Sequence, residues 1–254
     1  MRTNGVRRAT ALAAALGTLL TALTALAALS GCDSAENGGA RTAGERGAPA
    51  RDRHGSPAAV GTTRLPGVGE ALHRRIPADS GQVVVVYGRG GNSADATLVL
   101  YTERGTGWER TRSWPAHNGK KGWTVDHHMG DNRSPVGVYT LSDAGGVLDD
   151  PGARLPYTRD ESFAAPRQWA ASHWHDFDYV IAIDYNRLRG TPPNDPTRPE
   201  GEHRGGGIWL HMDHGSGTSA CVSVSKEAME YLLRTLDPAR HPVIVMGDRA
   251  HLTA

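Results

Sequence analysis

Runs of β-branched and aliphatic residues recur along the chain from about residue 80 onward and predict a series of strands. Val83–Tyr87 is a continuous apolar run bounded by Gly81 and Gly88, which is typical of a buried strand. A second run, Thr97–Tyr101, follows a Gly-rich segment that favours a turn. The same criterion predicts further strands at 108–114, 136–141, 179–183, 208–211 and 243–246.

One segment has a clear helical pattern. Ser225 is a favourable N-cap, and apolar residues recur at helical spacing from Met229 to Leu236. Pro238 limits the helix at its C-terminal end. With 32 Gly, 15 Pro and only two Phe, the chain is rich in turns. We therefore expect a mainly β fold with few helices.

The N-terminus has the features of an export signal. Arg2, Arg7 and Arg8 precede an apolar run over 9–29, which ends at Leu-Ser-Gly-Cys with Cys32 as the cysteine. This ending resembles a bacterial lipobox, in which the cysteine is lipidated and becomes the mature N-terminus. We expect residues 1–31 to be a lipoprotein signal peptide. A plain secretory signal with Cys32 as a bystander is the alternative.

Composition separates a tether from a folded domain. The segment after Cys32 is dominated by Gly, Ala, Arg, Asp, Glu and Pro, so it cannot bury enough apolar surface to offset its ordering entropy. We expect the lipidated cysteine and a disordered tether over 32–78 and a catalytic domain over 79–254. A formal net charge of +1 gives no sign of nucleic-acid binding. A tethered monomer on the outer face of the cytoplasmic membrane, facing the cell wall, is the expected state.

Candidate chemistry lies between His211 and Cys221. A predicted strand ends at His211, and a loop rich in Gly, Ser and Thr leads to Cys221, four residues before the helix N-cap. A nearby imidazole can take the thiol proton and so generate the reactive thiolate. The small residues Ser219 and Ala220 leave backbone N–H groups free for an oxyanion, and Thr218 can add a hydroxyl donor. A buried structural cysteine beside a satisfied histidine is the competing interpretation.

These residues resemble a known family. In the L,D-transpeptidase catalytic domain, a strand-end histidine precedes a Ser/Thr-x-Gly-Cys signature. Two segments of this chain are similar to that pattern: the run from Trp209 to His211, and the later Thr218-Ser-Ala-Cys-Val-Ser-Val224. Segment 133–141, Arg-Ser-Pro-Val-Gly-Val-Tyr-Thr-Leu, resembles the family's Thr-Pro-x-Gly-x-Tyr/Phe segment. Gly119–Gly122 lies where the family often has a Gly-rich turn. The resemblance covers roughly residues 80–250 and implies a β-sandwich or mixed-sheet domain with one helix following the nucleophile.

The chain departs from the family pattern beside the nucleophile. Ala220 occupies the position usually held by Gly, where a methyl group can crowd the oxyanion loop or require a conventional backbone angle. Ser223 stands where many members have Arg. His211 and Cys221 themselves are present.

The resemblance implies a reaction on peptidoglycan stem peptides. Cys221 is the implied nucleophile, His211 the implied base, and Thr218, Ser219 and Ala220 the implied oxyanion and substrate-binding residues. Such an enzyme forms a thioester with release of D-alanine, and an amine acceptor then gives a 3→3 cross-link. No metal and no organic cofactor is implied.

Other functions remain open at this point. If water replaces the amine as acceptor, the enzyme is an L,D-carboxypeptidase. If the domain has lost its catalytic activity, the protein is a non-catalytic wall-binding lipoprotein. A zinc peptidase is the least favoured reading, because the available histidines match no known zinc motif. His214 is interpreted as a surface loop residue and Asp184 as a strand-end structural residue. The potential zinc ligands are His173, His175, Asp176, His203, His211 and His214.

Overall fold

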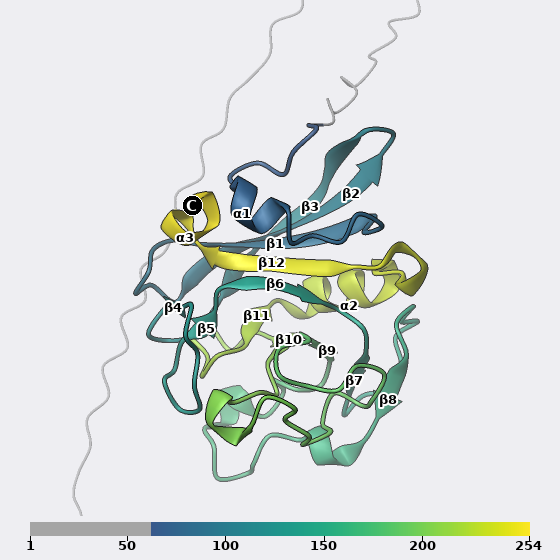
Figure 1. The fold of residues 1–254 in the computed structure, drawn as a ribbon. Coiled ribbons are helices and arrows are strands. Elements are labelled where there is room, and N and C mark those ends of the chain that lie inside the picture. The colour runs from purple at the N-terminus through teal and green to yellow at the C-terminus, as the bar shows by residue number, and fades with distance from the viewer. Residues whose placement is uncertain (1–61) are drawn as a thin grey trace, which may run out of the picture. The chain divides into compact units, whose positions relative to one another are not determined.

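The computed structural model describes residues 62–254, and these form a mainly β domain (Figure 1). Its main element is a mixed sheet of ten strands in the order β6-β12-β1-β2-β3-β11-β10-β9-β7-β8. A separate pair, β4 and β5, is parallel. The expected mainly β class and mixed sheet are thus confirmed. No helix within 62–254 is both long and apolar enough to span a bilayer.

The elements follow one another without internal repetition. The strands are β1 Gln82–Gly88, β2 Asp95–Arg104, β3 Gly107–His117, β4 Trp123–Thr124, β5 Ser134–Pro135, β6 Gly137–Thr140, β7 Ala144–Gly146, β8 Tyr157–Arg159, β9 Val180–Ala182, β10 Trp209–Met212, β11 Val222–Val224 and β12 Val243–Asp248. The α-helices are α1 Glu70–His73, α2 Lys226–Thr235 and α3 Arg249–Thr253. Short 3-10 helices are η1 Glu161–Phe163, η2 Ala171–His173, η3 Glu202–Arg204 and η4 Pro238–Arg240.

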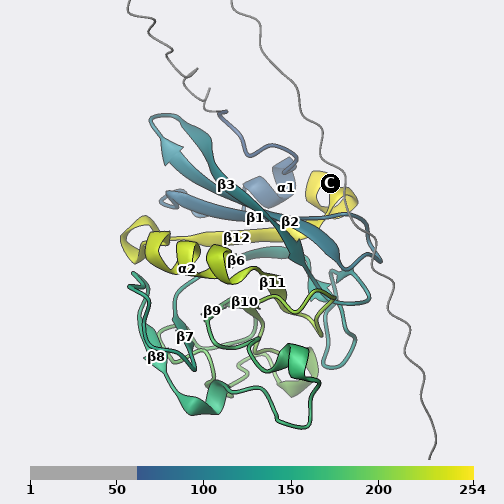
Figure 2. The same cartoon turned by 180° about the vertical axis from the view of Figure 1, so that it is seen from behind.

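Strand β1 is buried on both faces, which explains its continuous apolar run. Val84 and Val86 belong to the larger core, together with the apolar face of α2. Val83 and Val85 point the other way, into a smaller core that includes Leu252 of α3. Both views place α2 on one side of β1 and β12, and α1 and α3 on the other (Figures 1 and 2). A strand covered on both sides has no solvent face and so needs no polar alternation.

The folded domain begins earlier than the sequence predicts. Leu65, Val68 and Leu72 are buried in the smaller core, and Thr62 pairs with Trp108. The expected tether over 32–78 is therefore wrong for its last part. A few apolar residues in a polar stretch are enough to order it, because they cover an apolar face of the sheet. The expected signal peptide over 1–31 and lipidation at Cys32 lie outside the described residues.

The predicted helix is present as α2 and begins as expected. The hydroxyl of Ser225 accepts a hydrogen bond from the backbone N–H of Ala228 at 3.2 Å, which caps the first turn. Met229, Leu232 and Leu233 are fully buried against the sheet. The helix packs next to β10 and β11 and so supports the strands that carry the candidate chemistry.

Strands β10 and β11 position the candidate site. They are parallel neighbours, with Leu210 opposite Val222 and His211 opposite Ser223. The loop over 213–221 leaves the end of β10 and returns to the start of β11, so that Cys221 arrives beside Trp209. His211 lies two residues beyond Trp209 and therefore on the same face of the sheet.

Candidate active site

Cys221 lies just before β11 and is held by backbone groups of β10 and of the segment that precedes β10. Its Sγ accepts a hydrogen bond from the backbone N–H of Trp209 at 3.4 Å and donates to the carbonyl of Gly207 at 3.7 Å. Gly207 has a φ of 63°, in the left-handed region that favours glycine. The side chain is a free thiol and is partly exposed. The two contacts fix the position of the sulfur.

His211 is buried and oriented by the chain that follows it. The residue is 2% exposed, and its Nδ1 lies 2.8 Å from the carbonyl oxygen of Met212. A carbonyl can only accept, so Nδ1 carries the proton and Nε2 is left with its lone pair. The ring also packs edge-on against Phe177. This is the tautomer that a general base at Nε2 requires.

Cys221 and His211 line the same cavity. Its volume is about 480 Å³, and its wall also includes Thr218, Ser219 and Lys120. Among the described residues, the sulfur makes no hydrogen bond to the imidazole, as is common before substrate binds. A larger cavity of about 600 Å³ lies elsewhere, around Tyr87 and Arg110, and contains neither group. The smaller cavity is the candidate active site, because both Cys221 and His211 line it.

Burial keeps both groups neutral in the resting protein. It raises the pKa of the Cys221 thiol to about 11, against the opposing effect of the Trp209 N–H. It also lowers the pKa of His211 to about 4, although the hydrogen bond to Met212 acts in the opposite direction. At neutral pH the pair is therefore a thiol and a neutral imidazole.

The loop before Cys221 is anchored through its carbonyl groups. The hydroxyl of Thr218 donates to the Cys221 carbonyl at 2.6 Å, so the expected role of this hydroxyl as an oxyanion donor is not supported. The fully buried Ser134 donates to the Ala220 carbonyl at 2.6 Å. Ser134 lies in the upstream family-like segment, so sequence analysis quoted it but assigned it no role. These two hydroxyls fix the loop that carries Cys221.

Ala220 fits its position without backbone strain. Its φ is not positive, since the non-glycine residues with positive φ in the described part are Asn132, Asn186 and His241. Its side chain packs against the larger core. Within residues 62–254, the N–H groups of Ser219 and Ala220 donate to no protein acceptor. The expected role of these N–H groups as oxyanion donors therefore stays a prediction.

Ser223 has a partner that explains the absence of a longer side chain. It is fully buried, and its hydroxyl donates to Asp213 at 2.6 Å. Nδ1 of His117 lies 2.8 Å from the same oxygen, and the backbone N–H of Gly215 binds the other oxygen. Burial alone would raise the pKa of Asp213, but these donors outweigh it and lower the pKa. This arrangement ties both ends of the loop over 213–221 together.

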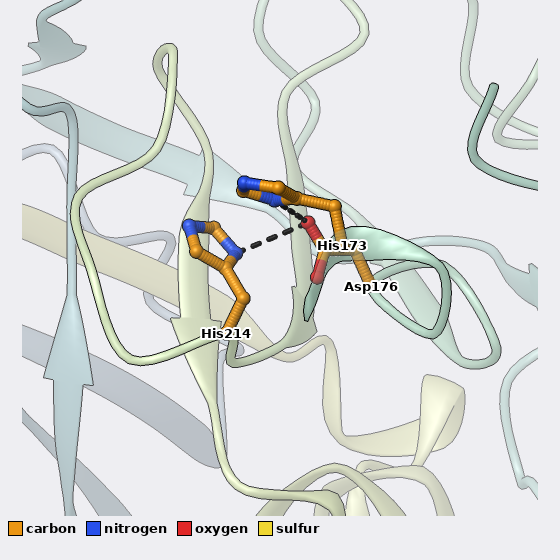
Figure 3. Close-up of side chains that lie close together, drawn as sticks. All are labelled: His173, Asp176 and His214. Atoms are coloured by element: carbon orange, nitrogen blue, oxygen red, sulfur yellow. Dashed lines mark hydrogen bonds and ion pairs between the residues drawn. The ribbon is translucent and has the colours of Figure 1, made fainter. Parts of the chain in front are cut away.

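A histidine cluster, consisting of His173, Asp176 and His214, lines the same cavity (Figure 3). Nδ1 of His173 and Nδ1 of His214 lie 2.9 and 3.0 Å from Oδ2 of Asp176. The His214 side chain is only 4% exposed, so its assignment as a surface residue is wrong. Of the other potential zinc ligands, His211 lines the cavity as described above, whereas His175 pairs with Asp178 and His203 stacks on His128.

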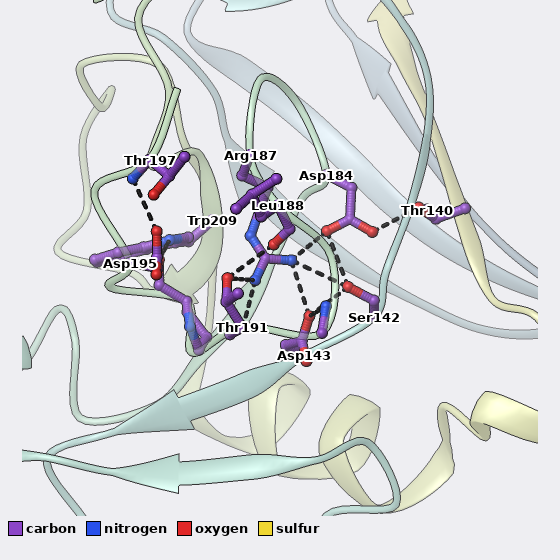
Figure 4. Close-up of polar contacts among 12 residues, drawn as sticks. Thr140, Ser142, Asp143, Asp184, Arg187, Leu188, Thr191, Asp195, Thr197 and Trp209 are labelled. Carbon is purple, nitrogen blue, oxygen red and sulfur yellow. Dashed lines mark hydrogen bonds and ion pairs between the residues drawn. The ribbon is translucent and has the colours of Figure 1, made fainter. Parts of the chain in front are cut away.

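Asp184 belongs to a second buried cluster, which we call the Arg187 network (Figure 4). Arg187 contacts Asp184 and lies 2.9 Å from Asp143, and all three side chains are at most 6% exposed. Hydroxyls of Thr140 and Ser142 also bind Asp184. Burial raises the pKa of Asp184, although Arg187 acts in the opposite direction. Asp184 therefore has the structural role that its place after a strand suggests.

Comparisons with known proteins bear on the segment that carries this site. Residues 83–245 match the family model described as the L,D-transpeptidase catalytic domain (YkuD). Among solved structures, the chain resembles Bd1075 from Bdellovibrio bacteriovorus with 18% identity and a TM-score of 0.38, over 71% of this chain. The match spans about half of that chain, 52% of its length. No curated protein matches the chain.

Proposed function

The chain belongs to the L,D-transpeptidase catalytic domain family, and from this membership we propose that it is a peptidoglycan L,D-transpeptidase with Cys221 as nucleophile and His211 as base. The proposed donor is a tetrapeptide stem, and the proposed product is a 3→3 cross-link. Neither acylation of Cys221 nor transfer of the acyl group to the acceptor requires a metal or an organic cofactor. The chemistry is acyl transfer through a thioester.

In the first step, Sγ of Cys221 attacks the carbonyl carbon of the third stem residue. His211 Nε2 takes the thiol proton as the C–S bond forms. The proposed oxyanion donors are the backbone N–H of Cys221 and those of its neighbours Ser219 and Ala220, none of which has a backbone acceptor in the described part of the chain. The C–N bond to the terminal D-alanine then breaks, and His211 returns the proton to the departing amine.

In the second step, an amine from another stem attacks the thioester carbonyl. His211 Nε2 accepts a proton from that amine, the C–S bond breaks, and the sulfur recovers the proton as a thiol. The new amide bond is the cross-link. Water in place of the amine gives a carboxylic acid and converts the reaction into an L,D-carboxypeptidase.

One observation carries the proposal: the single thiol of the described domain and a buried imidazole, whose Nδ1 is bound by the Met212 carbonyl, line one cavity. Both come from the ends of adjacent parallel strands, which gives them a rigid support. An intact pair of this kind also argues against a purely wall-binding role. The family match covers both residues.

Product analysis tests the proposal. The full chain is incubated with a purified tetrapeptide stem, and the products are separated and sequenced by mass spectrometry. We expect D-alanine release together with dimers linked between the third residues. Tripeptide without dimers would replace the transpeptidase by a carboxypeptidase, and no release of D-alanine by a folded protein would remove both.

We further propose that Cys32 carries a lipid and anchors the domain at the outer face of the cytoplasmic membrane. The lipobox-like sequence at 29–32 supports this. Expression with a clickable fatty acid in a bacterium is the test. Label on the wild-type chain that is lost in Cys32→Ser is the expected result, and label that persists would refute the anchor.

A further inference from the structure

We propose that His173, Asp176 and His214 form a binding site for a divalent transition metal of the zinc type, with its open coordination position facing the cavity. The site shares its cavity with Cys221, but the proposal does not rest on the proposed acyl transfer. It is also distinct from a zinc peptidase centre, since it includes neither His211 nor a helical His-Glu-x-x-His motif.

The three side chains offer converging ligand atoms. One ligand atom from each residue lies within 4.8 Å of the others, and Asp176 Oδ2 approaches both imidazoles at 2.9 and 3.0 Å. Bonds of about 2.0–2.2 Å at tetrahedral angles would separate zinc ligand atoms by roughly 3.3–3.5 Å. The observed spacings need only a small adjustment to admit an ion.

His214 supplies a second, independent observation. Its side chain is 4% exposed, yet neither ring nitrogen makes a hydrogen bond among the described residues, because the approach of Nδ1 to Asp176 lacks hydrogen-bond geometry. A buried imidazole whose two nitrogens make no hydrogen bond is unfavourable and rare, even with a carboxylate close by. A cation at the focus of the three side chains would be bound by this imidazole and would pair with the Asp176 carboxylate as well. Figure 3 shows both rings directed at the same carboxylate oxygen.

The backbone holds the three ligands in place without an ion. The Asp176 carbonyl accepts a hydrogen bond from the N–H of Met212 at the end of β10, which ties it to the central sheet. His214 follows Asp213, whose carboxylate is fixed by Ser223. His173 ends the 3-10 helix η2. Two imidazoles and one carboxylate suit zinc, and three protein ligands leave a fourth position for water or a ligand in the cavity.

A nearby pair provides a matched control. His175 and Asp178 have the same sequence separation and the same 2.9 Å contact as His173 and Asp176. His175 is exposed, with its side chain 75% accessible, and the described residues place no second histidine on Asp178. If a single His–Asp pair were sufficient, both positions would bind metal equally.

The test uses the full chain with Cys32→Ser, treated with chelator and then dialysed against Zn²⁺, with bound metal measured by mass spectrometry. We expect one equivalent of Zn²⁺, a tenfold or greater loss of affinity in Asp176→Asn and His214→Gln, and no change in His175→Asn. Visible absorption of bound Co²⁺ reports the ligand geometry. If His214→Gln does not fold, His173→Asn at its partly exposed site replaces it.

The same measurement on Cys221→Ser separates this site from the acyl-transfer chemistry. The proposed site retains Zn²⁺ in that variant, whether or not the protein proves to be a transpeptidase. The proposal is overturned if no Zn²⁺ is retained at micromolar concentration. It is equally overturned if binding depends on Cys221, or if His175→Asn weakens binding as much as His214→Gln.

Discussion

The Arg187 network and the wall of the cavity are both buried and polar, but they differ in how fully their groups are paired. Arg187 contacts two carboxylates and also donates to Ser142 and to the Thr191 carbonyl. On the cavity side, His214 has no hydrogen-bond partner within the described residues, and the hydrogen bonds of His211 involve Nδ1 and leave Nε2 free.

This difference distinguishes buried polar groups that stabilise the fold from buried polar groups that are available for chemistry. A paired network fixes one arrangement, here that of the long loop between β9 and β10, to which Arg187 belongs (Figure 4). Unpaired groups around a cavity have lone pairs left for a substrate or an ion. Buried charge alone does not indicate function in this fold; lack of internal partners, together with access to a cavity, does.

The largest expected effect is on the cavity side. His211→Asn removes the proposed base, and we expect acylation by a tetrapeptide donor to slow by about 10²–10⁴-fold. Little stability should be lost, because the polar side chain is retained. Single-turnover acylation rates measure the effect, with the exposed His241→Asn as control. A rate within tenfold of wild type would assign the base to another group.

The Arg187 network should respond in the opposite way. Arg187→Met leaves Asp143 and Asp184 buried without their counter-ion, which costs about 3–5 kcal/mol of unfolding free energy. The acylation rate per folded molecule should change little. Urea unfolding and active-site titration together measure both quantities. A stable variant with a large loss of acylation would mean that the network acts on the cavity.

The third prediction concerns the rate at which the Cys221 thiol is alkylated, on the cavity side. Since burial raises its pKa from 9.0 to about 11, the thiolate fraction at pH 8 falls about a hundredfold. The greater nucleophilicity of a more basic thiolate recovers roughly tenfold, so alkylation by iodoacetamide should be about tenfold slower than for an ordinary thiol.

The direction of the pH dependence of this alkylation rate also follows from the raised pKa. The rate should keep rising through pH 10, because the thiol is still mostly protonated there. The measurement uses the full chain with Cys32→Ser, and the same chain unfolded in urea is the control. A plateau near pH 7 would show a thiolate–imidazolium pair at rest and would contradict the neutral pair described above.

The smallest expected effect concerns Ala220. Because its backbone is not left-handed, Gly at this position gains nothing and adds unfolded-state entropy. We expect Ala220→Gly to change acylation by less than about twofold and to lower stability by roughly 0.5–1 kcal/mol. Thermal unfolding and acylation rates measure both. A marked acceleration would mean that the methyl group obstructs the oxyanion site.

The sequence was sufficient for the elements that bury long apolar runs. Strands β1, β2 and β12 and helix α2 have strong local signals and lie where these signals predict. The Ala-Gly-Gly strand β7 has no such signal and exists because its partners β8 and β9 pair with it. Helix α1 is a single turn held by the face that it covers.

The site was predictable only in its central pair. His211 and Cys221 lie in a recognisable run, but the residues that hold them come from distant segments. Ser134 reaches the Ala220 carbonyl across 86 positions, and His117 reaches Asp213 across 96. The burial of His214 depends on the 3-10 helix η2 and the segment that follows it. Such contacts leave no local pattern, so sequence analysis assigned them no role.

The central claim is that the cavity holds a cysteine that becomes acylated. The most direct measurement is the intact mass of the full chain carrying Cys32→Ser, rapidly quenched after mixing with a tetrapeptide stem, with the modified residue located by peptide mapping. We predict one added tripeptide acyl group, on Cys221, and none in Cys221→Ala. A folded protein that releases D-alanine with no adduct on Cys221, or that acquires the adduct in Cys221→Ala, would contradict the account.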